Sequence, residues 1–215
     1  MPPNCHTPSS GPYLTPIAST ETEYQIKKSR FIARLVLAHD RTEAMAALAQ
    51  AKRDYPDARH HCWAYVFGPP ESPKSIAMSD DGEPSGTAGK PILNVMQHKD
   101  VGDAMLVVIR YFGGIKLGAG GLVRAYSQAA QLIYEKAPTQ IHLVLEHYQI
   151  GCDFADEQNL RHWLKQHEGQ IVDLSYGSEG SHQVCLHIAL PAGHFQALSR
   201  YLGGIKNAYV KTSKN

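Results

Sequence analysis

The segment from Arg110 to Arg124 holds the residue types best suited to chemistry in this sequence, and that chemistry would be the binding of an anion. The segment is dense in glycine, at Gly113, Gly114, Gly118, Gly120 and Gly121. Glycine costs backbone entropy on folding, so this density indicates either positive φ angles or the close approach of another molecule. An apolar run precedes the segment, and apolar residues at helical spacing follow it. The first amides of such a helix are unpaired and favour a negative group.

Three cations belong to the same segment, namely Arg110, Lys116 and Arg124. We predict that these three cations and the five glycines together bind phosphate. The simpler interpretation is a tight strand-to-helix connection that holds no ligand. A plain connection of this kind is usually shorter, which favours the binding site.

A second glycine-containing loop, 79–91, is predicted to form the opposite side of the same cleft. Its candidate residues are Asp81, Gly82, Glu83, Ser85, Gly86, Thr87, Gly89 and Lys90. It is not a P-loop, because Pro91 follows Gly89-Lys90 and Pro84 stands where the first glycine is required. The 110–124 segment also lacks the dinucleotide-binding pattern, since Val123 occupies the position of its third glycine.

Acidic residues of the second loop are weak candidates for Mg²⁺ ligands. They are Asp80, Asp81 and Glu83. Oxygen ligands of this kind suit Mg²⁺, but acids on a loop are more often solvated turn residues, so we expect neither a metal site nor a cofactor.

His60, His61, Tyr111 and Phe112 are predicted to line the cleft. Adjacent strand residues face opposite sides, so only one of the two histidines can point into a given pocket. The neighbouring Cys62 would be a nucleophile only as a thiolate, and a buried structural thiol is the expected state.

Composition excludes several classes of protein. The net charge of +1 argues against a strongly basic nucleic-acid binder, although a local basic patch remains compatible with it. No run approaches the roughly 18 apolar residues of a membrane span, so no membrane association is expected. The four cysteines form no Cys-x-x-Cys pair, which argues against structural zinc. With no secretory signal pattern, we expect a cytoplasmic protein with reduced thiols.

The chain divides into three parts by pattern. Residues 1–20 are rich in Pro, Ser and Thr and are predicted to be a mobile lead-in. Residues 21–137 combine strand and helix patterns, and the strand 104–109 is apolar on both faces, as expected for a central buried strand. After a boundary at 137–140, residues 141–210 follow the order βαββαβ, the ferredoxin-like motif. The predicted fold class is α+β with two domains.

Four segments together resemble the IMPACT/YigZ family. They are Ser29-Arg-Phe-Ile32, His60-His-Cys-Trp-Ala-Tyr65, the loop 79–91, and Val108 to Tyr126 with its paired glycines. The resemblance implies an N-terminal domain of the ribosomal protein S5 domain 2-like fold over 21–137. It also implies a C-terminal ferredoxin-like domain similar to the last domain of elongation factor G. Eukaryotic relatives act in translational control with an additional N-terminal domain that this sequence does not contain, so the expectation that carries over is translation-linked binding.

The leading functional hypothesis is therefore a non-catalytic, translation-associated regulatory protein that binds RNA, the ribosome or a translation factor through the glycine-rich segment. One alternative is an enzyme that acts on a phosphorylated small molecule or nucleotide at the same loops. Another is a protein-interaction module whose exposed loops contact a regulatory protein partner.

Overall fold

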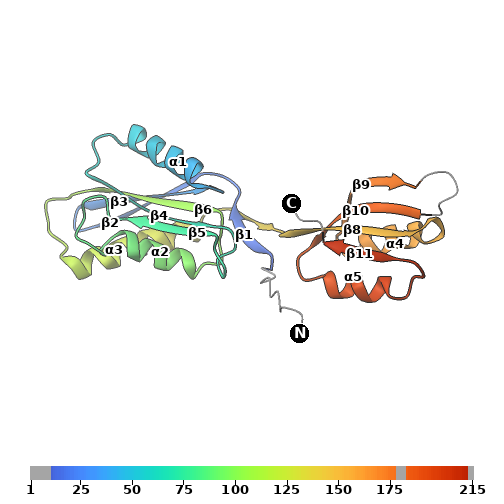
Figure 1. Cartoon of the computed structure of the whole chain (residues 1–215). Coiled ribbons are helices and arrows are strands. Elements are labelled where there is room, and N and C mark those ends of the chain that lie inside the picture. Colours follow the sequence, from blue (N-terminus) through green and yellow to red (C-terminus); the bar gives the residue numbers. More distant parts are fainter. Residues whose placement is uncertain (1–10, 178–182, 213–215) are drawn as a thin grey trace. The chain divides into compact units, whose positions relative to one another are not determined.

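An antiparallel sheet of five strands lies at the centre of the first part of the chain, in the order β2-β3-β6-β4-β5 (Figure 1). The computed structural model describes residues 11–177 and 183–212. The strands of this sheet are β2 (Thr20–Ile26), β3 (Ser29–Leu37), β4 (His60–Phe67), β5 (Ser75–Ser79) and β6 (Ala104–Tyr111). All neighbouring pairs are antiparallel.

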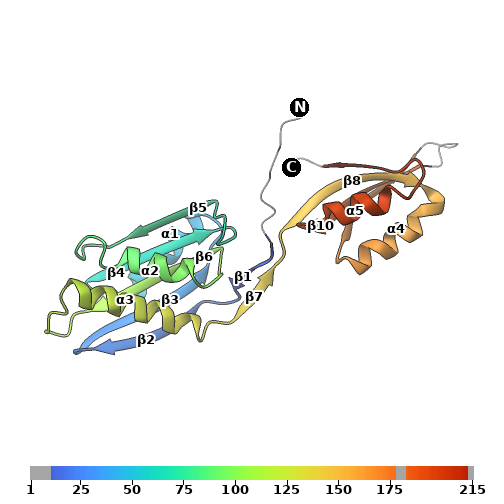
Figure 2. The same cartoon turned by 90° about the horizontal axis from the view of Figure 1, so that it is seen from below.

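Helices cover both faces of this sheet (Figures 1 and 2). They are α1 (Arg41–Asp54) on one face, and α2 (Gly89–Gln97) and α3 (Ala119–Tyr134) on the other. Strand β6 lies between two cores, since Leu106 belongs to the core beneath α2 and α3 while Met105 belongs to the core beneath α1. The prediction of a central strand that is buried on both faces is confirmed.

A short strand near the start of the described residues corrects the sequence analysis. Strand β1 (Tyr13–Pro16) pairs antiparallel with β7 (Thr139–His142). Tyr13 is buried, and its hydroxyl donates a hydrogen bond of 2.6 Å to Asp103. The prediction of a mobile lead-in over 1–20 is therefore wrong for this strand, because its packing depends on partners far along the chain. Residues 1–10 lie outside the described residues.

The second unit begins at Leu143 and has the order β8-α4-β9-β10-α5-β11. Its elements are β8 (Leu145–Asp153), α4 (Phe154–Gln166), β9 (Gln170–Tyr176), β10 (Gln183–Pro191), α5 (Phe195–Leu202) and β11 (Tyr209–Thr212). The sheet order β11-β8-β10-β9 is antiparallel throughout. Leu160 and Leu198, from the two helices, share one core with the sheet. The predicted βαββαβ arrangement is confirmed.

The α+β class with two domains is thus confirmed, while the division falls slightly later than expected. The first unit spans Tyr13–His142, because β7 is held by β1 rather than by the second sheet. Within the ranges 11–177 and 183–212, no helix is both long and apolar enough to cross a membrane.

Candidate functional site

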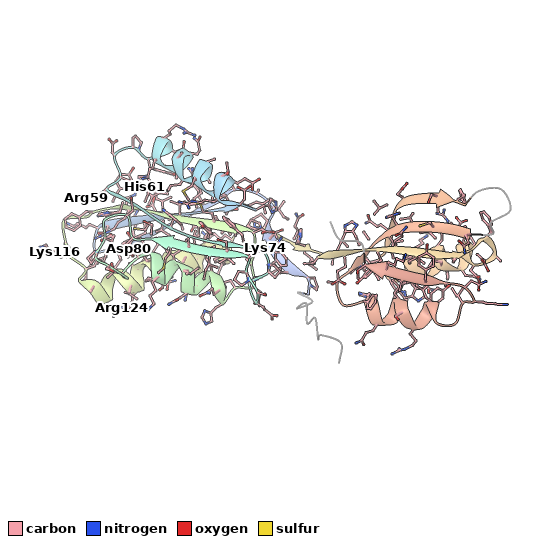
Figure 3. All side chains as sticks on the ribbon, viewed as in Figure 1. Arg59, His61, Lys74, Asp80, Lys116 and Arg124 are labelled. Carbon is pink, nitrogen blue, oxygen red and sulfur yellow. The ribbon has the colours of Figure 1, made fainter. Side chains whose placement is uncertain are left out.

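A cavity of about 420 Å³ opens where the two predicted loops meet. It is lined by Arg59, His60, Gly82, Glu83, Pro84, Arg110, Phe112, Lys116, Leu117, Gly118, Ala119 and Leu122. Figure 3 shows Arg59 and Lys116 at one end of the first unit and Lys74 at the other. The cavity therefore contains parts of both loops, the start of β4 and the first turn of α3.

The start of helix α3 has free backbone donors and reaches the cavity through Gly118, Ala119 and Leu122. Gly118 is the N-cap, at φ 73° and ψ 166°, a region of backbone conformation open essentially to glycine alone. The first helical hydrogen bond runs from the Leu122 amide to the Gly118 carbonyl, at 2.9 Å. The amides of Ala119, Gly120 and Gly121 precede that bond, so they have no intrahelical acceptor. The helix has no side-chain cap, which leaves its positive dipole end open to a negative group.

A buried ion pair forms the floor of the cavity. Arg110 Nη1 donates to Glu83 Oε1 at 2.5 Å, and both side chains are more than nine-tenths buried. The Tyr126 hydroxyl donates to the same Glu83 oxygen at 2.9 Å. The Arg110 guanidinium lies near two aromatic rings, 5.5 Å from the centroid of Phe31 and 5.7 Å from that of Phe112. The sequence analysis expected Arg110 to offer its charge to a ligand, whereas in the structure Glu83 balances that charge.

Cys62 lies behind this ion pair and is not a nucleophile. Its Sγ is 3.0 Å from the Asp80 carbonyl oxygen and 3.3 Å from the Tyr126 hydroxyl. Burial raises the pKa of the Cys62 thiol to about 12, so the thiolate is not formed near neutral pH. Burial also raises the pKa of Tyr126, which keeps its hydroxyl protonated as a donor to Glu83. The expectation of a buried structural thiol is confirmed.

Asp80 holds the second loop together by accepting three backbone hydrogen bonds. Its Oδ1 accepts from Ala88 and Gly89 at 3.0 and 2.8 Å, and its Oδ2 accepts from Gly86 at 2.8 Å. Burial raises the pKa of Asp80, but the hydrogen bonds from these amides outweigh burial and hold it below its ordinary value. The carboxylate is thereby committed to the loop and to the start of α2.

Removing this carboxylate is expected to loosen the loop. Because the folded pKa of Asp80 lies below the unfolded value, its contribution to stability is complete above about pH 4 and is lost as the pH falls through the folded pKa. Asp80→Ala should cost about 2–3 kcal/mol at neutral pH, since it leaves several amide donors unpaired. Urea denaturation at pH 7 and at pH 3 should show a smaller difference between wild type and variant at the lower pH. A difference that grows on acidification would contradict this role of Asp80.

Several residues of the second loop contribute to its structure and do not line the cavity. The Thr87 hydroxyl donates to the Pro84 carbonyl at 2.6 Å. A Cβ at Gly89 would lie 2.9 Å from the Ser79 backbone, so this glycine allows close packing of the chain. Gly86 has a φ of 75° and turns the loop. Of the remaining predicted residues, Gly82 and Glu83 line the cavity, whereas Ser85 and Lys90 are exposed away from its lining.

The acids proposed as weak metal candidates serve separate purposes. Asp81 Oδ2 accepts a hydrogen bond from the His61 amide at 2.7 Å, while Asp80 and Glu83 are engaged as described above. In the part of the chain that the structure describes, no three His, Cys, Asp or Glu residues gather in a way that could hold a metal ion.

The two histidines point to opposite sides of β4, as predicted. His60 lines the cavity, and its Nδ1 lies 2.8 Å from the Asp81 carbonyl oxygen. Since a carbonyl can only accept, Nδ1 carries the proton in the neutral ring and Nε2 is the acceptor. His61 is buried on the other face, and burial lowers its pKa.

The glycines of the first loop differ in what they do. A Cβ at Gly113 would lie 2.0 Å from the Lys28 carbonyl carbon, so this glycine packs against the turn between β2 and β3. Gly114 has a φ of 85° and open space around it. Gly120 and Gly121 belong to the first turn of α3, and a Cβ at Gly120 would lie 3.8 Å from the Arg124 guanidinium. Arg124, on the second turn of α3, is exposed but is not part of the cavity lining.

Sequence reasoning missed one cation and placed one aromatic residue in the wrong position. Arg59 lines the cavity and directly precedes β4. Its position next to that strand was the sequence feature that could have indicated it as a site residue. Tyr111 was expected in the cleft, but it packs against the core beneath α1, and the Arg30 guanidinium lies 5.4 Å from its ring. Phe112, the next residue, faces the cavity and is 47% exposed. Tyr111 is the last residue of β6 and Phe112 directly follows it, so the two neighbouring side chains point to opposite faces.

Comparisons with known proteins agree with this architecture. The Impact N-terminal domain matches residues 27–134, and a domain of unknown function, DUF1949, matches residues 150–202. A crystal structure of a hypothetical protein has a TM-score of 0.65 at 35% identity and covers 95% of this chain and 98% of that one.

Bacterial relatives extend over most of the chain. IMPACT family member YigZ of Escherichia coli is 40% identical over 192 residues, covering 88% of this chain and 91% of that protein. An IMPACT family member of Haemophilus influenzae is 38% identical over 177 residues, covering 82% and 85%. YvyE of Bacillus subtilis is 46% identical over 117 residues, covering 54% and 53%. The family's N-terminal domain contains the cavity, and the Escherichia coli and Haemophilus influenzae relatives are matched over 91% and 85% of their length, so the chain belongs to the IMPACT family.

Proposed function

We propose that this protein binds RNA by taking phosphate groups into the cavity at the start of α3, and that it acts in translation without catalysing a reaction. The observation that carries the proposal is the uncapped start of α3, where the free amides begin at Ala119, which lines the cavity together with two exposed cations, Arg59 and Lys116. Helix N-termini with nearby cations are a common phosphate-binding arrangement. The link to translation rests on the family resemblance and on the fold that it implies.

Contacts around the carboxylates argue against catalysis by these groups. A carboxylate that serves an enzyme as base or metal ligand has to be free near the phosphate of the substrate. Glu83 is engaged by Arg110 and Tyr126, and Asp80 by three amides. These contacts support a preformed binding site in which the carboxylates position cations and loops.

Charge removal at the cavity tests the proposal. Lys116→Ala and Arg59→Ala should each weaken binding of a fluorescent single-stranded RNA about tenfold, the equivalent of about one charge-assisted hydrogen bond. Each should also make the dependence of affinity on salt shallower, because one phosphate contact fewer releases fewer ions. Fluorescence anisotropy at several salt concentrations measures both effects.

Lys74→Ala is the matched control, since this exposed lysine lies at the opposite end of the same unit (Figure 3). It should bind RNA like wild type. Equal losses in the Lys74 and Lys116 variants would indicate binding by overall charge rather than by the cavity. Absence of salt-sensitive binding in the wild type would refute the proposed function itself.

A further inference from the structure

The charges that line the cavity favour one chemical class of phosphate. Arg59, Arg110 and Lys116 are cations, and Glu83 is the one carboxylate among the lining residues, which leaves an excess of two positive charges. The amino end of α3 adds a partial positive charge. A terminal phosphate monoester carries about two negative charges near neutral pH, whereas an internal phosphodiester carries one. The balance therefore matches a monoester.

A buried donor on the cavity floor independently points to a ligand. The Arg110 side chain is 7% exposed, and its Nε has no hydrogen-bond partner among the described residues. Of its guanidinium nitrogens, Nη1 is bonded to Glu83, and the guanidinium carbon lies 5.5 and 5.7 Å from the ring centroids of Phe31 and Phe112. A buried donor without an acceptor is unfavourable. A guanidinium that lines the cavity beside a helix N-terminus and keeps an unused donor is suited to an oxyanion.

The size and the walls of the cavity limit what can be attached to the phosphate. Its volume of about 420 Å³ lies toward the small end of ligand pockets. Phe112, Leu117 and Leu122 give it an apolar side, on which the exposed Phe112 ring offers a surface for stacking a base. A space of this size suits one nucleotide with a terminal phosphate. An internal phosphodiester would bring a nucleoside on each side.

We infer that the cavity binds the phosphate monoester of a single nucleotide, with the phosphate at the start of α3 and the base against Phe112. This inference rests on the same site as the proposed function and specifies its ligand as the phosphorylated end of an RNA. A free nucleoside monophosphate presents the same chemistry, so the experiment separates the two sources.

Competition and direct binding with matched RNAs test the inference on the full chain. The probes are one RNA sequence with a 5′-phosphate, with a 3′-phosphate, or with hydroxyls at both ends, together with a nucleoside monophosphate and its nucleoside. One of the end-phosphorylated RNAs should bind at least tenfold more tightly than the dihydroxyl RNA. That preference should disappear in Lys116→Ala, fall in Phe112→Ala, and persist in Lys74→Ala.

The outcomes separate the two proposals. If all three RNAs bind equally and still depend on Lys116, the inference is wrong and the proposed function stands. If the nucleoside monophosphate binds in a Lys116-dependent manner and no RNA does, the monoester assignment stands and RNA binding is wrong. If neither the RNAs nor the monophosphate binds, both are wrong.

Discussion

Replacing Glu83 with alanine should lower the free energy of unfolding of the first unit by about 3–5 kcal/mol, because it leaves the Arg110 guanidinium buried without a counter-charge. The Tyr126 hydroxyl loses its acceptor in the same variant. Denaturation by urea, followed by the fluorescence of Trp63 in a Trp163→Phe background, reports on this unit separately from the second.

Two further variants identify the ion pair as the cause. Glu71→Ala removes an exposed carboxylate from the same unit and should change stability by less than about 0.5 kcal/mol. The double variant Glu83→Leu/Arg110→Met replaces the pair with apolar groups and should recover much of the loss. If Glu83→Ala alone costs less than about 1 kcal/mol, the pair does not hold the floor of the cavity as described.

Gly113→Ala should be the second severe change, at about 3 kcal/mol or more. The new methyl group would lie 2.0 Å from the Lys28 carbonyl carbon and 2.2 Å from its oxygen. Both atoms are backbone atoms of a tight turn, in which Lys27 and Lys28 have φ angles of 46° and 64°, so neither can easily move away.

Gly114→Ala is the matched comparison, because the two glycines are adjacent. No atom lies within 4 Å of a Cβ at Gly114, so alanine there should cost only the strain of its positive φ, about 1–2 kcal/mol. The same urea experiment compares the two variants. A loss at Gly114 equal to or larger than that at Gly113 would contradict this account of the loop.

The glycine density of residues 110–124 predicted where the cavity lies, but it did not predict the structural role of each glycine. Gly118 caps α3 and faces the cavity, whereas Gly113 packs against the turn of a distant hairpin. A sequence shows that small residues are required, yet it does not show which atom approaches them. The flanking elements were easier to predict, because β6 is a continuous buried apolar run and α3 buries residues at helical spacing.

Pairings between distant segments had no signal in the sequence. Glu83 and Arg110 are 27 residues apart; they meet because the loop after β5 is bonded to the start of β4, and β4 is the neighbour of β6 in the sheet. Strand β1 pairs with β7 across more than 120 residues, and its Pro- and Thr-containing sequence does not resemble a buried strand. Both contacts depend on tertiary structure, which local propensity does not encode.

The most direct test of the central claim follows the backbone amides at the start of α3 by NMR. The full chain, labelled with ¹⁵N, is titrated with the end-phosphorylated RNA and, in parallel, with inorganic phosphate. The account predicts saturable shifts that are largest at Ala119, Gly120 and Gly121, with smaller ones at Lys116. Saturable shifts confined to other parts of the chain, with these three amides unchanged, would contradict it.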